Sequence, residues 1–225
     1  YLLSTDPAVP DTDLTPLLSV GASESRGEFA TPLPDGTHRL RAVARDIAGN
    51  EAEITVGFVV DTKEPTLAID NPQPGTFLST SEPTITLLYA DERSGIDPEL
   101  VEVKVDGVER AASLTLTATG ATLTLSRVLG LELADGPHQI EARVVDRAGN
   151  AMEAGPVTFG VDTVMPTAVI SAPVSQSFVG TATPSIQFTL SDPAPSSGIN
   201  TAFAQVLLDG VDITSTPNHD NPLME

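Results

Sequence analysis

The 225-residue sequence contains no cysteine and no tryptophan, and aromatic residues make up only 4% of it. Without cysteine, the chain forms no disulfides and offers no thiol nucleophile, and it gives no indication of a redox compartment. Hydrophobic residues still make up 40% of the sequence, which is enough for packed cores. We expect those cores to be built from Val, Ile, Leu and Ala.

Basic residues are scarce as well, with 11 Lys and Arg against 31 Asp and Glu, for a formal net charge of −20. This balance argues against nucleic acid as a partner, because phosphates require Lys and Arg. It also argues against binding to anionic membrane surfaces, and no apolar run is long enough for a membrane span. The charge suits a solvated, self-repelling chain or one that collects cations.

Motifs for catalysis are also missing from the sequence. It has no G-x-S-x-G nucleophile elbow, phosphate-binding glycine loop, Cys/His zinc spacing or EF-hand string. Its acids are scattered and lack the aromatic platforms typical of sugar-cleaving enzymes. We therefore predict that the chain is not an enzyme.

An internal repeat is the strongest positive feature of the sequence. The stretch LPDGTHRLRAVARDIAGN (33–50) matches LADGPHQIEARVVDRAGN (133–150) without a gap, and nine of the eighteen positions are identical. Both copies alternate apolar and polar residues, which predicts a strand with one buried face, and then reach Ala-Gly-Asn, which predicts a hairpin turn. The same alternation occurs in Ile54, Val56, Phe58 and Val60 after the first turn, and in Val101, Val103 and Val105. We expect Gly49 and Gly149 to adopt positive φ in these turns. His38 and His138 share a repeat position, so we interpret them as structural corner residues and not as general bases.

The rest of the chain contains short β-rich runs separated by turn residues, with no helical period. NPQPGTFLSTSEP predicts a turn-rich crossing, and SLTLTATGATLTLS (113–126) predicts two strands about a Thr-Gly turn. We interpret the Asp-Gly pairs Asp35-Gly36 and Asp135-Gly136 as turn signals. D-T-x-x-P joints follow the second arm of each repeat, at DTKEP (61–65) and DTVMP (162–166). We therefore predict three modules: a partial one at 1–61, a complete one at 62–162 and another partial one at 163–225. Because the pattern begins and stops within a module, we expect the sequence to be part of a longer protein.

The repeated patterns resemble a known group of proteins. DGTHRLRAVARDIAGN, ITVGFVVD, DTKEP and TITLLYADERSGI are similar to the tandem immunoglobulin-like repeats of bacterial surface and secreted proteins. The resemblance implies an all-β chain of tandem immunoglobulin-like Greek-key β-sandwiches. It also implies an extracellular or cell-surface location, and use as a stalk, spacer or adhesive module.

The resemblance places several acidic loops together. In such a sandwich the first strand, the loop after the second strand and the last hairpin turn share one end, so their side chains could bind Ca²⁺ through oxygen ligands. We name these candidate metal ligands: Asp61, Asp91, Glu92, Asp97, Asp146 and Asn150. The simpler alternative is that Asp146 and Asn150 cap their own turn and the other acids are solvated.

We thus predict a structural or adhesive stalk segment with neighbouring repeat modules, or an unknown surface ligand, as partners. The alternative is an accessory module of a secreted hydrolase that binds carbohydrate or protein. More copies of D-x-A-G-N beyond these residues would favour the stalk, and a catalytic domain would favour the accessory module.

Overall fold

The computed structural model describes residues 2–4, 12–13, 18–20, 25–29 and 31–214. Contacts within the chain divide it into two compact units that interleave along the sequence. The first unit contains residues 1–71, 85–123 and 140–157, and the second contains residues 72–84, 124–139 and 158–225. This division does not test the predicted module boundaries, which stay a prediction.

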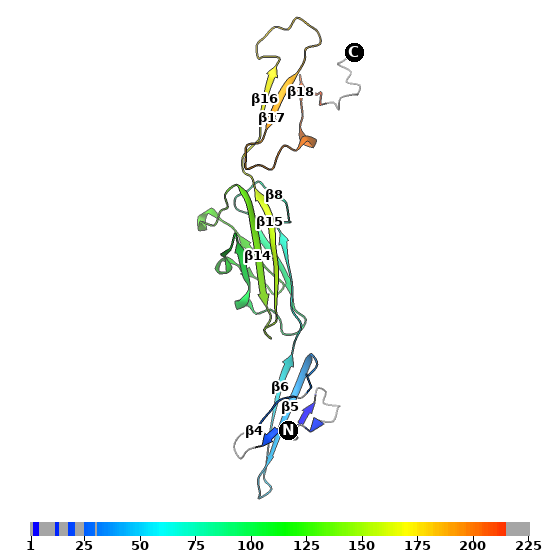
Figure 1. Cartoon of the computed structure of the whole chain (residues 1–225), viewed down its shortest axis with the longest axis vertical. Helices are drawn as coiled ribbons and strands as arrows, with labels where there is room; N and C mark the ends of the chain where they lie inside the picture. Colours follow the sequence, from blue (N-terminus) through cyan, green and yellow to red (C-terminus); the bar gives the residue numbers. More distant parts are fainter. Residues whose placement is uncertain (1, 5–11, 14–17, 21–24, 30, 215–225) are drawn as a thin grey trace. The chain divides into compact units, whose positions relative to one another are not determined.

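The structure confirms the predicted fold class, because the described residues form mostly antiparallel sheets of a sandwich-type, all-β fold (Figure 1). Their only helical segments are short 3₁₀ turns: η2 (Pro98–Leu100), η3 (Ala111–Ser113), η4 (Arg127–Leu129) and η5 (Thr201–Phe203). No helix among these residues is long and apolar enough to cross a membrane.

The first unit contains the first copy of the repeat as a long hairpin. Strands β5 (Gly36–Arg45) and β6 (Glu51–Val60) pair in register over their full length, from Gly36↔Val60 to Arg45↔Glu51. Two short strands, β1 (Leu2–Ser4) and β2 (Thr12–Asp13), extend this sheet in the order β2-β1-β5-β6. A separate pair is formed by β3 (Leu18–Val20) and β4 (Ser25–Gly27).

The second copy of the repeat lies in a five-stranded sheet with the order β11-β10-β14-β15-β8. Its strands are β8 (Phe77–Leu78), β10 (Glu102–Val105), β11 (Val108–Glu109), β14 (Gly136–Val145) and β15 (Ala151–Val161). A four-stranded sheet with the order β12-β13-β9-β7 contains β7 (Thr66–Asn71), β9 (Thr84–Ala90), β12 (Thr115–Leu116) and β13 (Gly120–Thr124).

Alternation of side chains explains where the core of the first unit lies. Successive residues of a strand point to opposite faces, and the apolar residues of these strands fall on one face. In the five-stranded sheet the buried residues include Val103, Val105, Ile140, Ala142 and Val144. In the four-stranded sheet they include Ile85, Leu87, Tyr89, Ala121 and Leu123. The period-two pattern therefore correctly predicted the buried faces of β10 and β14.

The hairpin β5–β6 has the same alternation but is not buried in the same way. Ile54 and Val56 of β6 are 65% and 52% exposed, whereas His38 is buried. The prediction of a buried face is therefore wrong for these residues. Alternation fixes which face is apolar, but burial also requires a facing layer, which these side chains lack among the described residues.

The second unit contains the four strands that follow the five-stranded sheet in the sequence. Strand β16 (Thr167–Ala172) pairs with β17 (Gln187–Ser191), and β18 (Leu207–Leu208) pairs with β19 (Val211–Asp212). The short strand β8 also lies in this unit and runs parallel to the end of β15, with Gly160 opposite Phe77 and Val161 opposite Leu78.

Candidate joint sites

The Asp-Gly pairs that begin each copy of the repeat hold the joint that follows its second strand. Asp35 Oδ1 accepts hydrogen bonds from Thr62 N at 3.0 Å and Thr62 Oγ1 at 2.9 Å. In the second unit Asp135 Oδ1 accepts them from Thr163 N and Thr163 Oγ1, both at 2.9 Å. Each aspartate therefore anchors the threonine of its D-T-x-x-P joint.

The aspartate of each joint makes a second connection to the loop that follows. Asp61 Oδ2 accepts a hydrogen bond from Ser94 N at 3.0 Å, and Asp61 Oδ1 accepts one from Lys63 N at 3.2 Å. In the second unit Asp162 Oδ2 accepts from Ser197 N at 2.7 Å, and Asp162 Oδ1 from Val164 N at 3.2 Å. Both units thus contain the same set of bonds at corresponding positions.

These contacts keep both joint aspartates ionised. Hydrogen bonds from the Ser94 hydroxyl and backbone, from Lys63 N, and the nearby Arg93 charge lower the pKa of Asp61, although burial opposes them. Hydrogen bonds from the backbone and hydroxyl of Ser197, and from Val164 N, lower the pKa of Asp162 against the same opposing effect. Hydrogen bonds to the charged form favour that form, so each carboxylate is a charged acceptor at neutral pH.

The hairpin turn of the second repeat closes on itself and also contacts the first joint. Asp146 Oδ1 accepts hydrogen bonds from Ala148 N at 2.9 Å and Asn150 N at 2.8 Å, and its Oδ2 accepts from Asn150 Nδ2 at 2.7 Å. Asn150 Nδ2 also donates to Asp61 O at 3.1 Å. The predicted self-capping of the turn is therefore present, and the same amide links the turn to the joint.

The structure brings three of the predicted metal ligands together. One carboxylate oxygen each from Asp61, Asp91 and Asp146 lie within 4.8 Å of one another. The third member, Asp91, accepts hydrogen bonds through Oδ1 from Arg93 N at 3.0 Å and Gly95 N at 2.6 Å. Carboxylates at such separations fit the 2.3–2.6 Å ligand distances of Ca²⁺. Backbone N–H groups already neutralise part of their charge, so the group is also stable as a network of hydrogen bonds.

Glu92 and Asp97 are not part of this group, whereas Asn150 contacts it. Glu92 pairs with Lys63 at 3.1 Å on the surface. Asp97 caps η2, because its Oδ1 accepts a hydrogen bond from Glu99 N at 3.0 Å. Asn150 points its amide nitrogen at Asp146 and Asp61, as described above, and so acts here as a donor.

The two repeat histidines are structural, as their shared position predicted. His38 Nε2 lies 2.8 Å from Pro34 O, and His138 Nε2 lies 2.8 Å from Ala134 O. Because a carbonyl oxygen only accepts, Nε2 carries the proton in both rings. The rings also pack against Phe58 and Phe159, with centroid distances of 5.5 and 5.6 Å. Each histidine thus holds the start of its hairpin in place through a hydrogen bond and a ring contact.

Sequence reasoning missed the role of Asp35 and Asp135, which it interpreted as turn residues only. Their partners Thr62 and Thr163 lie 27 and 28 residues further along the chain, so no local pattern reveals the contact. One signal was present, because the Asp-Gly pair and the Asp-Thr pair recur together at nearly the same spacing.

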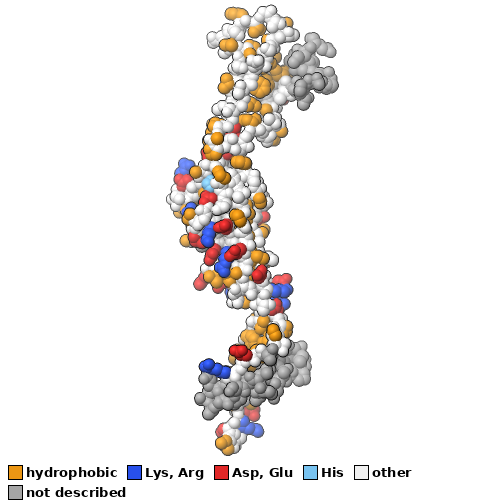
Figure 2. Space-filling view, viewed as in Figure 1, with side chains coloured by type: hydrophobic (Ala, Val, Ile, Leu, Met, Phe, Trp, Pro, Cys, Tyr) orange, Lys and Arg blue, Asp and Glu red, His pale blue; other side chains and the backbone are white. Residues whose placement is uncertain are grey.

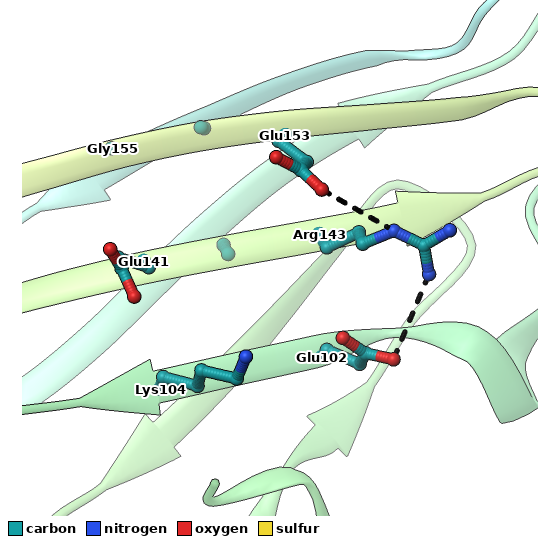
Figure 3. Close-up of a pocket in the computed structure, with 8 residues that line it drawn as sticks. Glu102, Lys104, Glu141, Arg143, Glu153 and Gly155 are labelled. Carbon is teal, nitrogen blue, oxygen red and sulfur yellow. Dashed lines mark ion pairs between the residues drawn. The ribbon is translucent and has the colours of Figure 1, made fainter. Parts of the chain in front are cut away.

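A shallow hollow of about 170 Å³ lies on the solvent face of β10, β14 and β15 (Figure 3). Arg143 lies between Glu102 and Glu153, with N–O distances of 3.7 and 3.6 Å. Gly155 lines the hollow, and a side chain does not fit there because its Cβ would come within 2.5 Å of Ile140 O. Exposed ion pairs of this kind contribute little to stability. We assign no chemistry to this hollow.

Comparisons with known proteins add only a general likeness. No protein-family model matches the chain, and no curated protein sequence matches it. Among solved structures, the fibronectin(III)-like modules of CbhA from Clostridium thermocellum are 19% identical, with a TM-score of 0.35 over 57% of this chain and 64% of that chain. CopC from Methylosinus trichosporium OB3b is 21% identical, with a TM-score of 0.34 over 44% of this chain and 94% of that chain.

An endo-β-1,4-mannanase from Thermotoga petrophila is 16% identical, with a TM-score of 0.36 over 45% of this chain. The match spans only 20% of the mannanase chain. Similarities at this level carry no conclusion about activity, ligand or location.

Proposed function

We propose that this chain is a non-enzymatic spacer or adhesive stalk segment of a bacterial cell-surface or secreted repeat protein. One observation carries the proposal: both joints have the same hydrogen bonds, accepted by Asp35 and Asp61 in the first unit and by Asp135 and Asp162 in the second. A spacer must control the connection between its segments. In this chain the hydrogen bonds of the joint recur together with the strands.

Several hydrogen bonds converge on the backbone of each joint. At each joint, two carboxylates accept from the threonine N–H and hydroxyl, from the next residue's N–H and from a loop serine N–H. Hydrogen bonds to a charged acceptor are stronger than those between neutral groups. Proline at the end of each D-T-x-x-P stretch removes backbone freedom as well, and Pro65 is fully buried.

Calcium binding is the finer part of the proposal. Asp61, Asp91 and Asp146 would hold the ion, with further oxygens from backbone or water completing the six to eight ligands that Ca²⁺ prefers. The cation would replace repulsion between three carboxylates with attraction to a shared charge. It would therefore stiffen the first joint.

Nitrogen-15 relaxation tests whether the joint restrains its neighbours. In the wild-type chain we expect the hairpin 36–60 and residues 66–71 to show one common rotational correlation time, because the joint bonds couple them. The double variant Asp35→Ala with Asp61→Ala should give two different correlation times. The control Glu92→Gln removes a nearby surface charge without touching the joint bonds, and it should behave like wild type. Separate correlation times already in the wild-type chain would contradict the spacer proposal.

Thermal melting of the wild-type chain and its variants, in calcium and in chelator, tests calcium binding. A ligand that binds only the native state stabilises it by roughly 2.7 kcal/mol at a hundredfold excess over its dissociation constant. We expect calcium to raise the melting temperature of the wild-type chain and of Glu92→Gln. Asp91→Asn combined with Asp146→Asn should abolish that rise. No response of the wild-type chain, or an equal response of the double variant, would remove calcium from the proposal and leave the joint bonds in place.

A further inference from the structure

Two of the three aspartates gathered at the first joint are buried. Asp146 is 1% exposed and Asp61 is 8% exposed, and one oxygen of each lies within 4.8 Å of an oxygen of Asp91. Buried carboxylates are stable when positive groups of the protein pair with them or when they coordinate a metal ion. The backbone N–H groups that bind these carboxylates carry no net charge. The joint therefore needs positive charge, either from the protein or from an ion.

The sequence has a basic residue shortly after each of these aspartates. The chain contains only 11 Lys and Arg against 31 Asp and Glu. Three of the 11 nevertheless come one or two residues after Asp61, Asp91 or Asp146: Lys63, Arg93 and Arg147. Such a concentration in an acidic chain indicates that the charge of this joint is compensated locally.

The other copies of the same motifs have no basic residue at these places. The residues found there are Val164 after Asp162, Pro193 and Ala194 after Asp192, and Ile47 after Asp46. Residues 163–225 contain no Lys or Arg, and the view in Figure 2 accordingly shows none over the C-terminal strands. The basic residues are therefore a property of the first joint and not of the repeat.

The side chain of Arg147 lies over the loop that binds the other two aspartates. Arg147 Nη1 donates to Ser94 O at 3.4 Å, and a Cβ on Gly95 would lie 3.2 Å from the same nitrogen. Ser94 N donates to Asp61 Oδ2, and Gly95 N donates to Asp91 Oδ1. The Arg147 guanidinium group is therefore held at the backbone that connects Asp61 with Asp91.

Arg93 brings a second positive charge to the joint. Its backbone N donates to Asp91 Oδ1 at 3.0 Å, and its Nε lies 4.0 Å from Asp35 Oδ2. Asp35 in turn accepts hydrogen bonds from Thr62, the neighbour of Asp61 in the chain. The guanidinium group of Arg93 therefore faces the joint and not the surrounding solvent alone.

The pKa values of the two joint aspartates agree with this placement. Hydrogen bonds from Ser94 lower the pKa of Asp61 most, and the charge of Arg93 lowers it further. The pKa of Asp162, in the second joint, is lowered by hydrogen bonds from Ser197 and from a backbone N–H. A positive side chain thus contributes at the first joint, in addition to the hydrogen bonds that both joints have.

Lys63 contributes less than the two arginines. Its Nζ lies 3.1 Å from Glu92 Oε2, and both side chains are mostly exposed. The charge of Lys63 is therefore matched by a neighbouring acid and screened by solvent. Arg93 and Arg147 remain as the positive groups that serve the aspartates.

We propose that Arg93 and Arg147 are built-in counter-charges for Asp61, Asp91 and Asp146, and that calcium binding at this joint competes with them. Without an ion, the two guanidinium groups offset the repulsion between the carboxylates and hold the joint together. With calcium, the same positive charges repel the cation and lower its affinity. The calcium part of this inference rests on the metal site proposed above, whereas the counter-charge part does not.

Thermal melting in chelator, at low and at high salt, tests the counter-charges without any metal. Arg93→Gln and Arg147→Gln each remove one charge, whereas Arg93→Lys and Arg147→Lys keep it. We expect both Gln variants to melt below the wild-type chain at low salt, and the Lys variants to stay close to it. The difference should shrink in about 1 M salt, where the screening length is only about 3 Å. Gln variants that melt like the wild-type chain at low salt, or a difference that salt leaves unchanged, would overturn the counter-charges.

Titration calorimetry with calcium chloride tests the competition. Loss of a positive charge near a divalent cation should strengthen calcium binding by about threefold or more in each Gln variant, and by about tenfold in the two combined. Lys104→Gln is the control for a lost charge and should bind like the wild-type chain. Lys104 lies on the solvent face of β10, opposite Glu141 and five residues along β14 from Asp146 (Figure 3). Arginines that only pack would have the opposite effect, because their loss would loosen the joint and weaken binding.

The two experiments separate this inference from the calcium proposal itself. If no variant binds calcium, the metal site fails together with the competition, and the melts in chelator still decide the counter-charges. If the wild-type chain binds calcium and the combined Gln variant binds it no more tightly, the metal site stands and the competition with Arg93 and Arg147 is wrong.

Discussion

At the scale of single residues, three pairs of aspartates of one chemical type perform three different tasks. Asp35 and Asp135 anchor a joint threonine, Asp46 and Asp146 close a hairpin turn, and Asp61 and Asp162 hold the next loop. The surrounding backbone N–H groups decide the task, and each pair repeats its own set of donors. A carboxylate is suited to all three tasks because it accepts several hydrogen bonds at once.

The lowered pKa values of Asp61 and Asp162 predict how stability depends on pH. Each folded-state pKa lies below the ordinary value of 3.8, so the unfolded chain binds protons more readily than the folded chain. Stability therefore rises with pH across this range. The contribution is fully present above the unfolded pKa, and it is lost as the pH falls from about 4 through the lowered folded pKa.

The variants Asp61→Asn and Asp162→Asn make this prediction measurable by urea denaturation at a series of pH values. Each should be less stable than the wild-type chain at neutral pH, and the difference should shrink as the pH falls below about 4. Glu92→Gln, at an exposed position, serves as the control and should show little difference at any pH. A difference that stays constant down to the lowest pH would mean that the charge of the joint aspartates does not stabilise the fold.

At the scale of elements, the repeat hairpin was predictable from sequence almost completely. The alternation and the Ala-Gly-Asn ending placed β5, β14 and their turns, and Gly49 and Gly149 adopt φ values of +94° and +98° as predicted. The paired strands β12 and β13 also formed around the predicted Thr-Gly turn. These features depend on neighbours in the sequence, which is why a local pattern reveals them.

Other elements depend on distant partners and were missed. Strand β8 is a two-residue parallel pairing at Phe77 and Leu78, in a stretch that the sequence suggested was only a turn-rich crossing. This short run has no alternation, and it forms a strand because its backbone pairs with the edge of β15. The candidate site shows the same limit, because the fold brings Asp61, Asp91 and Asp146 together, whereas Glu92 and Asp97 are equally acidic and have other partners.

The turn of the second hairpin gives a prediction at this scale. Gly149 adopts a φ that a β-branched residue tolerates poorly, although the space around its missing Cβ is open. Gly149→Val should therefore lower the free energy of unfolding by about 1 kcal/mol or more, from backbone strain alone. Ala148→Val, in the same turn, is the matched control and should cost less. Equal melting temperatures for Gly149→Val and the wild-type chain would remove the argument that this turn requires glycine.

At the scale of the whole molecule, the account depends on repetition. One strand hairpin, one joint and one loop recur along the chain, and the functional proposals follow from comparing the copies. The copies differ in burial, because β9 lies in a core while the face of its counterpart β17 is exposed. The central prediction is therefore that residues 62–162 form one complete sandwich, flanked by parts of two others.

Amide hydrogen exchange on the dilute, monomeric chain tests this claim most directly. Protection follows the free energy needed to open each segment, and strands with open edges and uncovered faces open easily. We predict strong protection between about residues 65 and 162, and weak protection in β5, β6 and β16–β19. Equal protection throughout the dilute chain would contradict the claim, because the flanking parts would then be as completely folded as the middle one.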